Sequence, residues 1–169
     1  MNGKYNVLFL CTGNSARSIM AEMIANQLGR DRLRAYSAGS QPAGRVHPLA
    51  LELLKKVGFS TEDARSKSWN EFSGSEAPVM DFIITLCDRA RDEPCPVWPG
   101  HPITAHWNVP DPAAVDGTPE QNRKAFQLAL QVLQQRISLM LALRLEALDR
   151  LAIETRLSQL GMPPIDQSA

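Results

Sequence analysis

The residues of this chain that are best suited to chemistry are a cysteine and an arginine that flank a short loop of small side chains. Cys11 ends an apolar run, Arg17 follows six positions later, and Ser18 comes next. A thiol followed by consecutive backbone N–H groups and a helix N-terminus lies in an electropositive environment that favours the thiolate. The pattern predicts that Cys11 is an activated nucleophile and that Ser18 donates its hydroxyl hydrogen to the sulfur. The alternative is a buried cysteine at a strand end without a chemical role.

The same loop is suited to holding an oxyanion. Its N–H groups can surround three oxygens of a tetrahedral anion, and the planar guanidinium of Arg17 can bind two of them. Gly13 permits a tight backbone path, and Asn14 can bond across the loop to hold its shape. The predicted oxyanion-binding residues are Thr12, Gly13, Asn14, Ser15, Ala16 and Arg17.

Two further cysteines bear on which reaction such a site would perform. Cys87 follows the apolar run of residues 81–86, and Cys95 lies in the polar segment after it. If Cys11 reduces its substrate, Cys87 can attack the Cys11 adduct to form a disulfide, which Cys95 can then attack and carry to the surface. In one alternative, Cys87 is a core residue and Cys95 an incidental loop residue. In the other, a zinc ion is bound by Cys87, Cys95, His101 and His106.

A nucleophile that attacks an oxyanion benefits from an acid that protonates the leaving oxygen. Asp111 is the candidate, in a segment from 87 to 118 that six prolines and two glycines keep from any regular periodicity. An Asp-Pro pair is also a common turn former, so a turn and a catalytic acid both stay open for Asp111 on the residues alone.

Hydrophobic periodicity predicts strands that alternate with helices. The expected strands are 5–10, 35–38, 81–86 and an edge strand at 103–109. The expected helices are 18–28, 48–57, 119–143 and 145–160. This order predicts an α/β fold, a four-stranded parallel sheet with helices on both faces and a C-terminal helical extension. Ligands of such sheets bind at the carboxyl ends of the strands, where Cys11 and Cys87 both fall.

Length and composition favour one main domain. The chain has 169 residues, of which 44% are hydrophobic, enough for a sizeable core. We expect the main domain at 1–143, with a helical extension and tail at 144–169 whose Pro163-Pro164 segment is disordered. The apolar helix of the extension either packs against its own domain or forms a homodimer.

Charge and patterning exclude several classes of partner. With 18 basic and 18 acidic side chains, nothing indicates a nucleic-acid partner or an anionic membrane surface. The N-terminus lacks a signal-peptide pattern, and no apolar run reaches the roughly 20 residues of a membrane helix. Three cysteines without an export signal argue against a structural disulfide framework. We therefore expect a cytoplasmic protein.

These residues resemble the low-molecular-weight protein tyrosine phosphatase fold and, within it, the thioredoxin-coupled arsenate reductases. The resemblance covers residues 5 to about 143. Its motifs are residues 11–18 followed by Met20-Ala21-Glu22, residues 36–39, His106-Trp107 with residues 111–113, Thr85-Leu86-Cys87, and Cys95-Pro96. It implies that Asp111 is the general acid and that the three cysteines form a thiol relay.

The function implied is reduction of arsenate to arsenite. The residues implied as catalytic are Cys11, Arg17, Ser18, Asp111, Cys87 and Cys95. The resemblance implies no bound cofactor and an external thiol reductant, either thioredoxin or glutaredoxin with glutathione. The interval from Cys87 to Cys95 is about one residue longer than in well-known reductases, which leaves the choice of reductant open. Ala16 replaces a cysteine that many relatives carry.

Some relatives bind a potassium ion near the asparagine of the loop. Asn14, Glu22 and Ser37 match that site, whereas Ser68 stands at its remaining acidic position. The resemblance thus leaves a potassium ion open.

Two other functions are compatible with the pattern. A phosphatase would use Cys11, Arg17 and Asp111 to hydrolyse phosphate monoesters through a phospho-cysteine, and its other thiols would be idle. From another class, the chain would be a non-enzymatic protein that binds an oxyanion or a metal.

Overall fold

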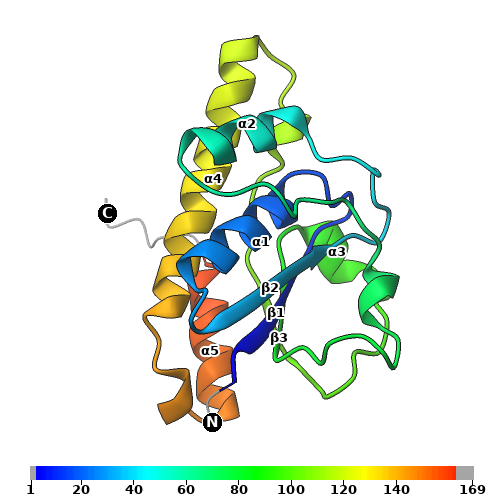
Figure 1. Cartoon of the computed structure of the whole chain (residues 1–169), viewed down its shortest axis with the longest axis vertical. Helices are drawn as coiled ribbons and strands as arrows, with labels where there is room; N and C mark the ends of the chain where they lie inside the picture. The colour runs from blue at the N-terminus through cyan, green and yellow to red at the C-terminus, as the bar shows by residue number, and fades with distance from the viewer. Residues whose placement is uncertain (1–2, 163–169) are drawn as a thin grey trace.

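The computed structural model describes residues 3–162, which form a four-stranded sheet packed against helices (Figure 1). All strand pairs are parallel, and the strand order is β2-β1-β3-β4. The strands are β1 (Tyr5–Leu10), β2 (Leu33–Ala38), β3 (Phe82–Thr85) and β4 (Ile103–His106). The predicted four-stranded parallel sheet is therefore confirmed.

The connections reverse direction between β1 and β3. The chain leaves β1 through α1 (Arg17–Leu28) and pairs β2 on one side. It then returns through α2 (Pro48–Lys56) and the 3₁₀ helix η1 (Trp69–Phe72) to place β3 on the other side of β1. Where neighbouring connections leave in opposite directions, the carboxyl ends of the strands open a ligand-binding crevice. Cys11 and Cys87 follow the two strands on either side of this reversal.

The two faces of the sheet are covered unequally. In Figure 1, α4 and α5 lie to the left of the strands and α3 to the right. Phe9 and Ile84 belong to the larger core, with α1, α4 (Pro119–Leu141) and α5 (Arg150–Leu160). On the opposite face, Leu8, Leu10 and Ile83 share a smaller core with Trp69, Phe72 and Trp98. Because side chains alternate along a strand, one apolar run supplies both cores.

The C-terminal helix α5 packs within its own chain. The indole Nε1 of Trp107 donates to the carbonyl of Leu157 at 2.8 Å, and both side chains are fully buried. Leu145, Ile153 and Leu157 join the same core as the strands. A Cβ on Gly161 would lie 2.1 Å from the carbonyl oxygen of His106, so the end of α5 requires a glycine there. Of the two arrangements that the sequence left open, the structure thus shows residues 145–160 packed against their own domain.

Elements in the segment from 87 to 118 differ from the sequence prediction. A short helix α3 (Asp88–Asp92) follows β3, and a 3₁₀ turn η2 (Pro112–Ala114) follows Asp111. The sulfur of Cys87 caps α3 by accepting from the N–H of Ala90 at 3.4 Å. Ala90 is the one buried residue of α3, so the helix carries no apolar periodicity that the sequence could reveal.

The observed ends of other strands and helices differ from the predicted ones by a few residues. The strand expected at 103–109 ends at His106, and the helix expected at 145–160 is divided into the 3₁₀ helix η3 (Leu145–Ala147) and α5. The helix starts predicted at residues 48 and 119 are confirmed, and the side chains of His47 and Thr118 each accept a helix N–H as caps. No helix within 3–162 is long and apolar enough to cross a bilayer. Pro163-Pro164 lies outside the described residues.

Replacing Leu157 tests whether α5 belongs to the core. We expect Leu157→Ala to lower the free energy of unfolding by about 2–5 kcal/mol, because the side chain is fully buried and its loss leaves a cavity. Leu151→Ala, on the same helix but 73% exposed, should change it by less than about 0.5 kcal/mol. Urea denaturation measures both. A change in the free energy of unfolding as small in Leu157→Ala as in Leu151→Ala would show that α5 contributes nothing to the core.

Candidate functional site

The loop between β1 and α1 turns its carbonyls outward. The N–H groups of Gln41, Ala43 and His47 donate to the carbonyls of Thr12, Gly13 and Ser15 at 2.8–3.0 Å. The N–H groups of residues 12–16 make no hydrogen bond to any other described residue. Unpaired N–H groups of consecutive residues form an anion-binding concavity. The geometry thus agrees with the predicted oxyanion loop.

Cys11 lies at the base of this loop, 3% exposed, with its sulfur 2.8 Å from the hydroxyl oxygen of Ser18. That oxygen accepts a hydrogen bond from the amide Nδ2 of Asn14 at 2.7 Å. Since Asn14 already donates to it, the hydroxyl has its own hydrogen free for the sulfur. The expected contact between Ser18 and Cys11 is present, and it is arranged to stabilise a thiolate.

Asn14 ties the loop to two distant segments. It is fully buried and adopts a left-handed backbone conformation with φ of 42°, which asparagine tolerates better than most residues. Its Oδ1 accepts from the N–H of Lys67 at 2.8 Å, which fixes the amide orientation. Its Nδ2 donates to the hydroxyls of Ser18 and Ser37. Asn14 therefore bonds across the loop, as the sequence predicts.

Gly39 allows β2 to approach the loop closely. A Cβ at this position would lie 2.4 Å from the carbonyl oxygen of Thr12 and 2.9 Å from that of Cys11. Any larger residue would push the loop away from the sheet. In the sequence, Gly39 only follows the strand predicted at 35–38, and no local pattern indicates this packing role.

Arg17 and Asp111 meet at the rim of the loop. The guanidinium of Arg17 donates to the carbonyl of Val109 at 3.0 Å and lies 3.6 Å from a carboxylate oxygen of Asp111. The other carboxylate oxygen of Asp111 accepts from the N–H of Ala113 at 3.0 Å. Asp111 is thus both a turn former and a neighbour of the oxyanion loop, so the two alternatives are compatible.

Cys87 lies beside Cys11. Both side chains are buried and form one small contact cluster with Ala90. The sulfur of Cys87 is 3.7 Å from the hydroxyl oxygen of Thr12, a loop residue. That hydroxyl donates to a carboxylate oxygen of Glu93 at 3.0 Å, which links the end of α3 to the loop. Sequence reasoning missed Glu93, because a carboxylate in a polar segment carries no local signal.

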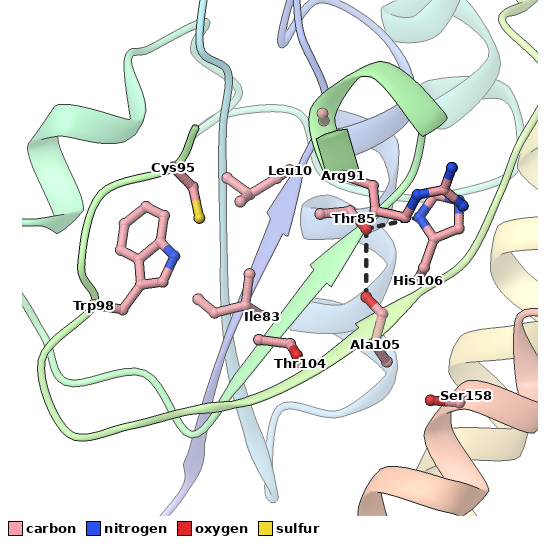
Figure 2. A pocket seen from close by; sticks show the side chains of 11 residues that line it. Leu10, Ile83, Thr85, Arg91, Cys95, Trp98, Thr104, Ala105, His106 and Ser158 are labelled. Atoms are coloured by element: carbon pink, nitrogen blue, oxygen red, sulfur yellow. Dashed lines mark hydrogen bonds between the residues drawn. The ribbon is translucent and has the colours of Figure 1, made fainter. Parts of the chain in front are cut away.

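Cys95 is not part of this cluster. It is exposed and lines a cavity of about 380 Å³ on the outer face of the sheet. Figure 2 shows Cys95 and Trp98 on one side of this cavity and Arg91 and His106 on the other. His106 lies between Thr85, at 2.7 Å, and Asp88, at 3.0 Å, and so connects β4 to the start of α3. The structure therefore brings two of the three cysteines together.

The sequence left a zinc site and a potassium site open, and the geometry bears on both. Among residues 3–162, no group of three or more histidine, cysteine, aspartate or glutamate side chains could hold a metal, which argues against the zinc alternative. At the possible potassium site, the ammonium of Lys67 lies 3.2 Å from Glu22 and 3.2 Å from the hydroxyl of Ser37. A potassium ion does not fit where this cation already stands.

A comparison with family models shows which protein family this chain belongs to. Residues 6–151 match the model described as low molecular weight phosphotyrosine protein phosphatase. The chain belongs to this phosphatase family. Its curated relatives in the family include the arsenate reductase of Bacillus subtilis, 38% identical over 121 residues, 72% of this chain and 84% of that protein. The arsenate reductase of Halalkalibacterium halodurans is 35% identical over 137 residues, 81% and 94% of the two chains.

Solved structures of the phosphatase family give the same fold. An arsenate reductase in a phosphate-binding state superposes with a TM-score of 0.63 at 26% identity, over 82% of this chain and 97% of that one. The low-molecular-weight tyrosine phosphatase of T. tengcongensis gives 0.63 at 25% identity, over 80% and 96%. A thioredoxin-dependent arsenate reductase from Corynebacterium glutamicum gives 0.54 at 25%, over 80% and 63%.

Substituting Gly39 tests the close approach of β2 to the loop. We expect Gly39→Ala to weaken the binding of inorganic phosphate about tenfold or more and to lower the free energy of unfolding by about 1–3 kcal/mol, because the new Cβ collides with the loop carbonyls. Isothermal titration calorimetry and urea denaturation measure these quantities. Gly74→Ala is the matched control, since open space surrounds that glycine. Wild-type phosphate affinity in Gly39→Ala would refute the packing role.

The buried pair of Glu22 and Lys67 predicts a pH dependence of stability. Burial raises the pKa of Glu22 above its ordinary value of 4.5, and the ion pair and hydrogen bond with Lys67 oppose that shift without cancelling it. The folded protein therefore holds this proton more tightly than the unfolded chain, so stability declines as the pH rises from about 4.5 through the folded pKa. Relative to Glu22→Gln/Lys67→Met, the wild type should lose unfolding free energy over that range. A relative gain would contradict the assignment.

Proposed function

We propose that this protein is an arsenate reductase that uses a relay of three thiols. The observation that carries the proposal is the contact cluster of Cys11 and Cys87 beside an oxyanion loop whose N–H groups have no acceptor among residues 3–162. A phosphatase needs one nucleophilic cysteine, whereas a reductase needs a second thiol within reach of the first. The curated relatives that are named arsenate reductases support the same choice.

The first step is attack on arsenate. The loop N–H groups and the guanidinium of Arg17 hold three oxygens, and the thiolate of Cys11 attacks arsenic from the base of the loop. A sulfur–arsenic bond forms and an arsenic–oxygen bond breaks. Asp111, 3.6 Å from Arg17 at the rim, protonates the leaving oxygen, which departs as water. The hydroxyl of Ser18 stabilises the thiolate before attack.

The second step transfers two electrons. The thiolate of Cys87 attacks the sulfur of Cys11, and the electron pair of the sulfur–arsenic bond passes to arsenic. Arsenic(V) becomes arsenic(III), arsenite departs, and the two thiols become a disulfide. The hydroxyl of Thr12 lies 3.7 Å from the sulfur of Cys87, at the point where this attack begins.

The third step requires α3 to unfold. Cys87 caps the helix at its start and Cys95 lies beyond its end, so Cys95 reaches Cys87 only when the intervening segment changes conformation. The helix has five residues, one of them buried, and isolated helices of this length are unstable in water. Cys95 then attacks Cys87, releases the Cys11 thiol and leaves a Cys87–Cys95 disulfide.

An external dithiol protein of the thioredoxin type completes the cycle. It reduces the Cys87–Cys95 disulfide by thiol exchange at the exposed Cys95. The thioredoxin-dependent relative in Corynebacterium glutamicum supports this choice over glutathione with glutaredoxin. We place the protein in the cytoplasm, since a reducing compartment keeps its three thiols free.

Phosphate monoester hydrolysis is the second candidate function. The observation that favours it is the shared arrangement of Cys11, Arg17 and Asp111, which suits a phospho-cysteine intermediate equally well. A solved relative of the same fold is a tyrosine phosphatase.

Serine variants of the two relay cysteines separate these functions. With arsenate, thioredoxin, thioredoxin reductase and NADPH, we expect Cys87→Ser and Cys95→Ser to lose about 100-fold or more of steady-state arsenite formation, because each breaks one exchange step. Cys95→Ser should still release one arsenite per chain and accumulate a Cys11–Cys87 disulfide, which mass spectrometry detects. Wild-type rates in Cys87→Ser would eliminate the relay.

Hydrolysis of p-nitrophenyl phosphate by the same proteins is the matched measurement. Arsenite formation by the wild type, with aryl phosphate hydrolysis at least about 100-fold weaker in kcat/KM, supports the reductase. Efficient hydrolysis that is unchanged in Cys87→Ser, without arsenite formation by the wild type, would assign the protein as a phosphatase.

A further inference from the structure

A buried lysine lies behind the oxyanion loop. Among residues 3–162, the buried polar and charged residues are Asn14, Ser18, Glu22, Ser37 and Lys67. Lys67 and Glu22 are the charged members, at 7% and 5% exposure. Burying a charge is costly unless a partner and hydrogen bonds compensate, so a buried ammonium needs a structural or functional reason.

The ammonium of Lys67 is fully satisfied by oxygen atoms. It lies 3.2 Å from a carboxylate oxygen of Glu22, 3.2 Å from the hydroxyl of Ser37 and 3.0 Å from the carbonyl of Arg65. An ammonium has three donors, and each has one acceptor here. A carboxylate, a hydroxyl and a carbonyl around one point are also the kind of oxygen set that binds a small metal cation.

The same lysine contacts the loop through two paths. Its backbone N–H donates to Oδ1 of Asn14 at 2.8 Å, and Ser37, which its ammonium contacts, accepts from Nδ2 of Asn14 at 3.0 Å. Asn14 in turn donates to Ser18, whose hydroxyl contacts the sulfur of Cys11. The ammonium therefore ends a continuous chain of buried hydrogen bonds that begins at the nucleophile.

We propose that Lys67 is a positioning residue that supplies the cation of this site from within the chain, so that no external monovalent cation is required. The inference rests on the proposed role of the loop in binding an oxyanion. Its ammonium compensates Glu22 and holds Ser37 and Asn14 where they orient the loop. Without it, the carboxylate, hydroxyl and carbonyl oxygens would form a vacant site for a small monovalent cation.

The first measurement uses the wild-type protein. The affinity for inorganic phosphate, by calorimetry, and kcat/KM for arsenate should agree within about twofold in potassium chloride and in choline chloride at equal ionic strength. Choline is too large to enter a buried site. Activation by potassium of several-fold or more would show that a metal ion is needed, and would overturn the inference.

The second measurement uses Lys67→Met, which keeps the length of the side chain and removes its charge. In choline chloride, we expect phosphate affinity to fall about tenfold, because Glu22 is left unpaired beneath the loop. Potassium or methylammonium chloride should restore most of the affinity, whereas a merely structural loss would not respond to the cation. Wild-type phosphate affinity in Lys67→Met, in every salt, would overturn the inference.

Two variants serve as controls. Glu22→Gln/Lys67→Met buries no charge and should fold, bind phosphate weakly and show no response to potassium. A potassium response in this double variant would place the cation elsewhere and overturn the inference, even where Lys67→Met alone does not fold. Lys56→Met, at the exposed end of α2, should behave as the wild type. Failure of the wild type to bind phosphate or arsenate in any salt would instead overturn the proposed function itself.

Discussion

Residues 12–16 present consecutive backbone N–H groups that have no acceptor within the described chain, and the surrounding structure keeps them unpaired. Such groups are costly unless an anion or water satisfies them. Segment 41–47 binds the loop carbonyls, which prevents the peptide planes from turning. Gly39 allows this contact at short range, and Asn14 locks the loop from behind. The proposed oxyanion would therefore meet a loop whose N–H groups are already held in place.

The fold brings together the two thiols that would react first, and it keeps the third thiol apart from them. Cys11 and Cys87 follow adjacent parallel strands, so both lie at the same edge of the sheet, where their side chains share one contact cluster. Cys95 lies on the far side of a five-residue helix. In the proposed relay, the strands would hold the first exchange pair together, and the short helix would keep Cys95 apart until the first disulfide forms.

Much of this arrangement could be predicted from local patterns. The apolar run at 5–10 and the spacing of Cys11, Arg17 and Ser18 lie in one short stretch. The strand, the loop and the start of the helix can therefore be predicted from residues that are close in the sequence. Caps at His47 and Thr118 are equally local. The short helix α3 was missed, because tertiary contacts and the sulfur of Cys87 stabilise it rather than an apolar repeat. The C-terminal helix was predicted, but its periodicity could not say which surface it would cover.

By itself, the sequence determined the fold class and predicted the nucleophile and the loop around it, because these depend on residue types within a few positions of one another. Only the tertiary structure decided that Cys87 joins Cys11, that Glu93 reaches Thr12, and that Lys67 fills the space beside Glu22. Each of these contacts joins residues 45 or more positions apart, as in the Lys67 to Asn14 bond across 53 positions. No local pattern encodes such a pairing, since it exists only when β1, β2 and β3 lie side by side and bring their following segments to one edge.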